Sequence, residues 1–388
     1  MEIMALHASS LFQILILHVL LNIIGLSQQH SGCGYHRVLL PLGFMQDMKG
    51  FVCNIIPKEK MDGVDIVLYN RVCPYDNNWE AFRELMNHPK IVMDIDDDWI
   101  LPPNHLLYDQ YAELAPRIEN NLRTADLVTV TNELLASKVR PFNKNVEVIP
   151  NGIPFGRNQF TDERRTGERV SIFWAGSVTH EHDIKILKYP LQRLQGQKDK
   201  IIMTMAGWND SNAVSEHIWR KMFSSFTAGC TLPYRKIHAM EPVNYMAAYE
   251  HADIMVIPLE SSEWHGCKSN LKILEAASKR IPCIVSNVKP YNNDTDAPVL
   301  WVNSQQDWFK HLNFLINDKA ARLELGEKLY QWANKNYHLE QINIKRRSVF
   351  SGLCQAQTHL GLFQQHGGDG ELSPAHTAGI VRGLSEVA

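Results

Sequence analysis

Short apolar runs alternate with longer amphipathic segments along most of the chain. Short runs rich in valine and isoleucine are typical of strands buried in a parallel sheet. In the first half they predict strands at Phe51–Ile56, Val64–Tyr69, Lys90–Ile95, Leu127–Val130 and Val146–Ile149, and helices at Val38–Met45, Trp79–Met86 and Leu106–Arg123. Strands that alternate with helices in this way indicate an α/β domain with a parallel sheet.

The same alternation starts again in the second half. Strands are predicted at Val170–Trp174, Ile201–Ala206, Tyr234–Met240, Ile254–Ile257 and Cys283–Val285, and helices at Val243–Glu250, Asn270–Lys279, Asp307–Ile316 and Ala320–Tyr337. Between the halves, the turn cluster Pro150–Pro154 is followed by the polar stretch Arg157–Arg169, which has no apolar periodicity. We therefore expect two α/β domains with a cleft between them.

These breaks divide the chain into four segments. Residues 31–156 and 157–352 are predicted to be the two Rossmann-like domains, and residues 353–388, which contain Gly, Gln and His without periodicity, a disordered tail. Residues 1–30 are an apolar segment in which we predict a first strand around Phe12–Val19. Polar residues interrupt this segment, which disfavours a membrane span, although a membrane-associated start remains the alternative.

Composition narrows the class of protein. The 388 residues are 45% hydrophobic and 21% charged, which is typical of a soluble protein with a sizeable core. A net charge of -3 gives no reason to expect nucleic acid as a partner. The seven cysteines are scattered without a CxxC pair, which argues against a disulfide framework or a zinc site and for a reducing compartment. We expect a cytoplasmic protein, with peripheral membrane association left open.

The stretch Ala252–Ser286 carries the clearest chemistry. It contains a predicted strand, a loop, a helix and a second strand, and in such a βαβ unit ligands bind where the helix begins. Free backbone N–H groups and the helix dipole favour an anion there. Lys268 lies just before the first turn, and Lys272 and Glu275 share a face near it. A nucleotide diphosphate fits this pattern, and so does an ordinary amphipathic helix with solvated lysines.

Three other stretches contain candidate residues. A glycine-containing turn at Ser31–Arg37 and a small-residue turn at Ala175–Asp183 each follow a strand, and Asp183 either caps the next helix or contacts a ligand. Four aspartates within Asp94–Asp98 end another strand and repel one another unless water, a cation or hydroxyl groups meet them. We favour contacts with substrate hydroxyls, a base, or solvated caps over a metal site. Among the tryptophans, Trp264 is the best candidate for a ligand contact, because its loop precedes the predicted helix, and we interpret the others as packing residues.

Several of these fragments occur in the order found in one group of enzymes. They are Val148–Ile153, Phe173–Ser177 with Thr179, His180 and Asp183, Ala252–Ile254 through Pro258–Leu259, Lys268–Lys272 with Leu274–Ala276, Ser31–Tyr35 with Arg37, and Asp94–Asp98. Together they resemble a divergent bacterial and phage-type branch of the family 4-like glycosyltransferases of GT-B fold. The resemblance covers residues 31–350. It implies two Rossmann-like domains that face a cleft, the first for the acceptor and the second for a nucleotide-sugar donor.

The resemblance also implies roles for individual residues. Glu275 matches the second glutamate of the E-x7-E motif, which holds the donor ribose, and Lys268 neutralises the diphosphate leaving group. The full predicted donor-binding set is Gly34, Arg37, Gly176, Ser177, His180, Lys268, Ser269, Asn270, Leu271, Lys272 and Glu275. Lys268, Glu275 and Asp97 are the predicted catalytic residues, and no metal ligand is predicted.

One departure stands out, because Cys267 occupies the place of the first glutamate of the motif. The contact of that glutamate with the transferred sugar is then missing or comes from Glu263, His265 or the aspartate run. The resemblance implies transfer of a sugar from a nucleotide-sugar to a hydroxyl acceptor such as a glycan, with retention and without an obligatory cofactor. The alternatives are a sugar-nucleotide epimerase or hydrolase, and a non-catalytic nucleotide-sugar-binding protein.

Overall fold

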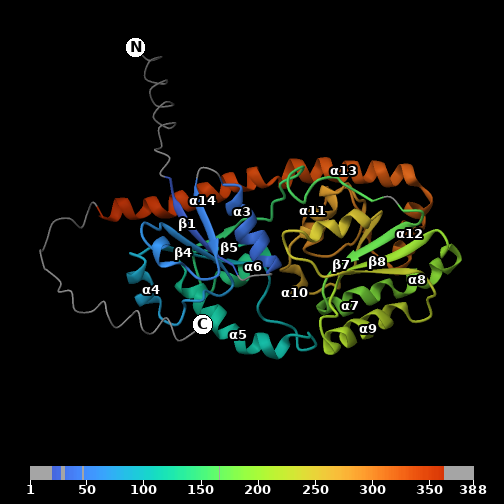
Figure 1. Cartoon of the computed structure of the whole chain (residues 1–388), viewed down its shortest axis with the longest axis horizontal. Coiled ribbons are helices and arrows are strands. Elements are labelled where there is room, and N and C mark those ends of the chain that lie inside the picture. Colours follow the sequence, from blue (N-terminus) through green and yellow to red (C-terminus); the bar gives the residue numbers. More distant parts are fainter. Residues whose placement is uncertain (1–19, 28–30, 46–47, 166, 362–388) are drawn as a thin grey trace, which may run out of the picture.

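The computed structural model describes residues 20–27, 31–45, 48–165 and 167–361 (Figure 1). The strand predicted at residues 12–19 lies outside these ranges, and the first described strand is β1, Asn22–Leu26. Within the described ranges, no helix combines the length and apolar character needed to cross a membrane.

The first domain contains a six-stranded parallel sheet with the order β2-β1-β3-β4-β5-β6. After β1, its strands are β2 (Lys49–Cys53), β3 (Ile66–Asn70), β4 (Lys90–Ile95), β5 (Leu127–Val130) and β6 (Val146–Val148). Its helices are α2 (Gly32–Gly34), a π-helical turn (Tyr35–Leu39), α3 (Leu40–Gly43), a 3₁₀ turn (Lys58–Lys60), α4 (Trp79–Leu85), α5 (Tyr108–Thr124) and α6 (Glu133–Val139). Apolar side chains cover both faces of the sheet, as the neighbours Ile23 and Ile24 of β1 show by packing in different core clusters.

The second domain contains another six-stranded parallel sheet, with the order β9-β8-β7-β10-β11-β12. Its strands are β7 (Val170–Ala175), β8 (Ile201–Trp208), β9 (Tyr234–His238), β10 (Ile254–Ile257), β11 (Cys283–Ser286) and β12 (Leu300–Val302). Its helices are α7 (Glu181–Ile184), α8 (Lys188–Arg193), α9 (Ala213–Thr227), α10 (Glu263–Gly266), α11 (Leu271–Ser278), α12 (Gln305–Asn317) and α13 (Lys319–Tyr337), with short 3₁₀ turns at Val178–His180, Lys185–Leu187, Leu194–Gln197 and Tyr291–Asn293. This is the strand order of the Rossmann fold, which binds ligands where the order reverses, here between β7 and β10.

The sequence predicts β4, β5 and β10 with their observed bounds, and the two parallel α/β domains are confirmed. Some bounds shift, as for the strand predicted at Phe51–Ile56, which is observed at Lys49–Cys53, and two predictions differ more strongly. The helix predicted at Val243–Glu250 is instead a pair of 3₁₀ turns, Tyr245–Ala247 and Tyr249–His251. Helix α14 (Leu339–Gly361) continues nine residues into the tail predicted from residue 353, because its buried face packs on the first domain.

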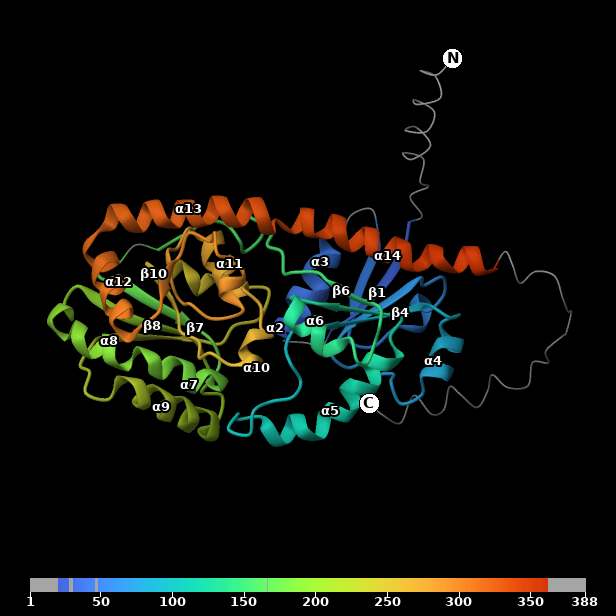
Figure 2. The same cartoon turned by 180° about the vertical axis from the view of Figure 1, so that it is seen from behind.

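The chain crosses between the two domains twice. After β6 it enters the second domain, and at the end of α13 it returns as α14, which lies along the first sheet (Figures 1 and 2). The crossings are bonded to each other, because Ile153 N donates to Tyr337 O at 3.0 Å and Leu339 N donates to Ile153 O at 3.0 Å. A Cβ atom on Gly152 would lie 2.8 Å from Leu339 Cα, so only glycine fits this close approach.

Candidate functional site

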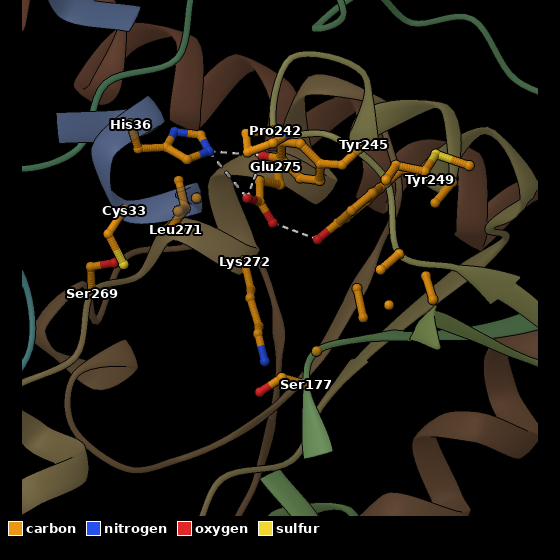
Figure 3. Close-up of a pocket in the computed structure, with 18 of the residues that line it drawn as sticks. Cys33, His36, Ser177, Pro242, Tyr245, Tyr249, Ser269, Leu271, Lys272 and Glu275 are labelled. Atoms are coloured by element: carbon orange, nitrogen blue, oxygen red, sulfur yellow. Dashed lines mark hydrogen bonds and ion pairs between the residues drawn. The ribbon is translucent and has the colours of Figure 1, made fainter. Parts of the chain in front are cut away.

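A cavity of about 470 Å³ lies between the two domains, at the carboxyl ends of the strands of both sheets (Figure 3). It lies beside the point where the strand order of the second sheet reverses, which is where the fold predicts a ligand. Seven residues of the predicted donor set line it, namely Arg37, Gly176, Ser177, Ser269, Leu271, Lys272 and Glu275. Gly34, His180, Lys268 and Asn270 are not lining residues.

Two glycines form the floor of this cavity in the second domain. Gly207 has a φ of +98°, and a Cβ atom there would lie 2.2 Å from the carbonyl oxygen of Gly176. A Cβ atom on Gly176 would meet the Trp174 ring at 2.7 Å. The backbone just after β7 and the backbone near the end of β8 therefore touch beneath the cavity, and neither glycine has a side chain to fill the space above them.

Replacing Gly207 by alanine should lower the free energy of unfolding by about 3 kcal/mol, because strain at positive φ and a backbone clash both oppose the new Cβ atom. Gly196→Ala is the matched control, since Gly196 has no positive φ and no neighbour within 4 Å of an added Cβ atom. Urea unfolding of the two variants measures the difference. Equal urea midpoints for the two variants would contradict the prediction, because they would show that the backbone at Gly207 adjusts to a Cβ atom without loss of stability.

Lys272, in the first turn of α11, places an ammonium group in the cavity. Its side chain extends toward Ser177 (Figure 3), and it makes no ion pair within the described part of the chain. Burial lowers the pKa of Lys272 to about 8, helped by the nearby Lys268 cation and opposed by Asp183. A largely buried cation without an ion-pair partner is costly, so an anionic ligand gains strongly from binding beside it.

Glu275, one turn further along α11, lies in a hydrogen-bonded network that the sequence did not reveal. Tyr245 OH donates to Glu275 Oε1 at 2.5 Å, and Tyr249 OH donates to Oε2. His36 of the first domain reaches Tyr245 OH through Nε2 at 2.9 Å. Because Tyr245 donates its only hydroxyl proton to Glu275, it accepts from His36, which must carry its proton on Nε2.

Burial controls the charges in this network. It raises the pKa of Glu275, whereas the two tyrosine hydrogen bonds lower it. Burial and the Arg37 cation lower the pKa of His36 to about 3, so the imidazole is neutral. Its Nδ1 is buried and accepts no hydrogen bond from any described residue.

Arg37 was predicted as an anion partner, but its guanidinium is already engaged by protein acceptors. It bonds both carboxylate oxygens of Asp94, at 2.9 and 2.8 Å, and donates to Asn151 Oδ1 at 3.0 Å and Ile149 O at 2.9 Å. Its side chain is only 1% exposed. Arg37 thus ties the end of β4 to the first interdomain crossing, and any ligand contact would have to compete with these bonds.

Each of the four aspartates at the carboxyl end of β4 has a basic partner. Asp94 pairs with Arg37, Asp96 with Arg71 at 3.2 Å, and Asp98 with Lys138 at 2.6 Å. Asp97 lies 3.4 Å from Arg71 and 3.5 Å from Lys268. Cations from the protein, rather than water alone, therefore offset the repulsion. No group of three or more His, Cys, Asp or Glu residues in the described ranges has a geometry that could hold a metal ion.

The remaining predicted residues support the cavity walls. Ser269 Oγ accepts from Asn151 at 2.9 Å, and Asn270 donates to Asp294 at 2.8 Å. Gly34 packs against Ser27, where a Cβ atom would lie 2.2 Å from the hydroxyl. Lys268 lies over the Trp264 ring at 4.2 Å.

His180 and Asp183 form a pair behind the glycine floor. His180 Nδ1 bonds Asp183 Oδ2 at 2.7 Å, and Asp183 Oδ1 accepts from Glu260 N at 2.9 Å. Of the two alternatives left open for Asp183, a helix cap and a ligand contact, the structure excludes the cap, because Asp183 lies within α7 and His180 is the residue before that helix. Burial and Lys272 lower the pKa of His180 to about 3.

Cys267, which replaces the expected glutamate, does not reach the cavity. Its side chain is fully buried in the apolar core of the first domain, and burial raises the pKa of its thiol to about 12. Sequence reasoning also missed His36, Asn151, Tyr245 and Tyr249. The only sequence signal for the two tyrosines was their spacing of four residues, which places them on one side of a helical segment.

Comparison with solved structures identifies the fold class. No family model matches the chain, and no curated protein sequence matches it. HepE from Anabaena, in complex with UDP and glucose, aligns with a TM-score of 0.60 at 11% identity, over 86% of this chain and 100% of HepE. A glycosyltransferase from Rickettsia africae aligns with a TM-score of 0.56 at 11% identity, over 86% of this chain and 98% of that protein.

TarM from S. aureus, in complex with fondaparinux, alpha-GlcNAc-glycerol and UDP, aligns with a TM-score of 0.51 at 12% identity, over 74% of this chain. The chain spans about half of the TarM length, 54% and 55% in two structures. These similarities show that the chain has the GT-B fold, as the sequence predicted.

Proposed function

We propose that the protein is a glycosyltransferase that moves a sugar from a nucleoside diphosphate sugar to a hydroxyl acceptor, with retention and without an obligatory metal. The observation that carries this proposal is the Lys272 ammonium, which extends toward Ser177 in the cavity that Gly176 and Gly207 also line and forms no ion pair with any described residue. A diphosphate in this cavity would receive the Lys272 charge and the positive end of α11. HepE and TarM, which share this fold, have been solved in complex with UDP, and this supports a nucleotide donor.

Each part of the donor has a matching part of the cavity. The Glu275 carboxylate has about four acceptor sites, of which the tyrosines use two, so ribose hydroxyls can donate to the others. Ala239, Met240 and Pro242 supply an apolar wall for the base. As the bond to the sugar breaks, negative charge develops on the diphosphate, and the fixed charges of Lys272 and Lys268 stabilise it.

Calorimetry with UDP-, GDP- and ADP-sugars, followed by product analysis with and without hydroxyl acceptors, tests this proposal. Transfer with the anomeric configuration unchanged by NMR, and with full activity in EDTA, is the expected result. Isomerised or hydrolysed donor that is independent of an acceptor would instead indicate an epimerase or hydrolase. Binding without turnover would identify a non-catalytic binding protein, which the burial of Cys267 would explain. Absence of binding by all three nucleotides would overturn the proposal.

The affinity for a nucleoside diphosphate should fall as the pH rises through about 8. The free protein binds the anion best when Lys272 is charged, and its pKa is lowered to about 8. Above that pH the dissociation constant should rise toward about tenfold per pH unit, as linkage to one proton requires. Calorimetry between pH 6 and 10 measures the profile, and Lys272→Met should remove the inflection. An unchanged inflection in that variant would assign the titration to another group.

A further inference from the structure

A second cavity, of about 260 Å³, lies beside the first, since Ser177 lines one and Val178 the other, and the two share no lining residue. It is lined by both domains, because residues 102–106 before α5 face residues 178–183 and 260–265 of the second domain. In both views of the fold, the segment that precedes α5 reaches the second domain beside α9 (Figures 1 and 2). Its volume lies just below the range of about 300–1,000 Å³ typical of drug-sized ligands, so it suits a small ligand.

The two cavities share a wall. Asp183, which lines the second cavity, is bonded to His180, and the His180 ring would contact a Cβ atom on Gly176 in the first cavity at 3.4 Å. Trp264, another lining residue, lies beneath the Lys268 ammonium at 4.2 Å, and Lys268 in turn lies 3.5 Å from Asp97. A ligand in the second cavity would therefore lie next to the groups proposed to stabilise the leaving diphosphate.

Two hydrogen-bond donors in this cavity lack partners. The Trp264 Nε1–H group is buried and has no acceptor among the described residues. His105 accepts from Leu107 N at Nδ1, at 3.1 Å, so it must carry its proton on Nε2, for which the described residues provide no acceptor. The Trp264 group has almost no accessible surface, so in this cavity it is the partly buried His105 that is open to a ligand acceptor.

The charge of the cavity disfavours an anionic ligand, because its lining contains the carboxylates Glu181, Asp183 and Glu260 and no lysine or arginine. Burial and the Lys268 cation lower the pKa of both His105 and His265, so both imidazoles are neutral at pH 7. Neutral imidazoles donate and accept, and the Glu260 and Asp183 carboxylates accept only. Donors and acceptors beside an indole ring match a ligand with several hydroxyl groups and one apolar face.

We propose that the second cavity binds a neutral sugar ring of the acceptor, at a subsite distinct from the donor cavity. This inference rests on the proposed glycosyltransferase function. It assigns to His105, Trp264 and Ile218 the contacts that select the acceptor.

Saturation-transfer NMR with methyl glycosides of glucose, galactose, mannose and N-acetylglucosamine tests the subsite. The full chain is first saturated with whichever of UDP, GDP or ADP binds in calorimetry, so that the donor cavity is filled. At least one glycoside should still give a signal. His105→Ala removes a donor and Ile218→Trp fills the cavity from α9, and each should weaken glycoside binding by about tenfold or more. His217→Ala, at the exposed position next to Ile218, is the matched control.

Nucleotide affinity, measured by calorimetry, should stay unchanged in all three variants, which shows that they fold. The inference is overturned if no glycoside binds to the nucleotide-saturated protein, if the nucleotide displaces the glycoside, or if neither His105→Ala nor Ile218→Trp weakens its signal. Failure of all three nucleotides to bind would instead overturn the proposed function, so the two failures are distinguishable.

Discussion

Replacing Lys272 by methionine should lower the rate of sugar transfer by about 10²–10³-fold and, at the same time, stabilise the fold. The rate falls because the diphosphate loses a fixed charge that stabilises it as it leaves. Stability rises because the charged amine is buried: its pKa is lowered from 10.5 to about 8 in the folded protein. Below pH 8 the folded state bears the full cost of that charge, and the methionine side chain avoids it.

The pH dependence of stability shows whether Lys272→Met stabilises the fold by removing a buried charge or only by improving the packing of the side chain. Between about pH 8 and 10.5 the amine loses its proton in the folded protein before it does so in the unfolded chain, so wild-type stability rises with pH. The advantage of Lys272→Met should therefore shrink across that window, as urea unfolding at pH 7 and 10 would measure. Lys185→Met, on the exposed surface of the same domain, should change neither rate nor stability appreciably. A destabilised but fully active Lys272→Met would contradict both parts of the prediction.

Replacing Arg37 by methionine should lower the free energy of unfolding by about 3–5 kcal/mol, because it leaves the Asp94 carboxylate buried without its cation. Both side chains are at most 2% exposed, and the bidentate pair joins the first helical segment to the end of β4. Guanidinium unfolding measures the loss. The variant should also bind nucleotide more weakly, since the same guanidinium holds Asn151 and Ile149 of the interdomain crossing.

A double-mutant cycle isolates the pair. Arg37→Met combined with Asp94→Leu should be more stable than Arg37→Met alone, because no unpaired charge remains. Arg220→Met, which breaks an exposed pair with Glu216 on α9, is the control and should leave the unfolding midpoint nearly unchanged. Equal losses in the single and double variants would show that Asp94 is stabilised by Thr129 and Asn70 rather than by Arg37.

The elements that the sequence predicted well are those set by local pattern. The apolar runs of β4, β5 and β10 are buried on both faces, so their periodicity and composition leave little choice of structure. Helix α14 was not predicted, because its apolar residues meet the first domain only after the chain has crossed back. Its Asn343, for example, donates to the carbonyl of Pro41, which is 302 residues away.

In the candidate site, too, local features were predicted from the sequence and long-range contacts were not. Lys272 and Glu275 were predicted from one helix start, since spacing on a helix is a local property. The engagement of Arg37 by Asp94 and of Glu275 by Tyr245 depends on sequence separations of 57 and 30 residues. Only the folded topology brings such groups together. Arg37, which was predicted to bind an anionic ligand, therefore pairs with Asp94 and stabilises the first domain instead.

The two bonded crossings at Ile153 and Leu339 have a consequence for how the donor cavity fills. The paired crossings are covalent links between the domains, and their backbone hydrogen bonds oppose sliding more than they oppose rotation about this place. We therefore expect the two domains to rotate relative to each other about an axis near Ile153 and Leu339, which would open or close the cavity between them. The His36–Tyr245 hydrogen bond joins the domains at 2.9 Å, so rotation that separates the domains breaks it and leaves the Tyr245 hydroxyl bonded to Glu275 alone.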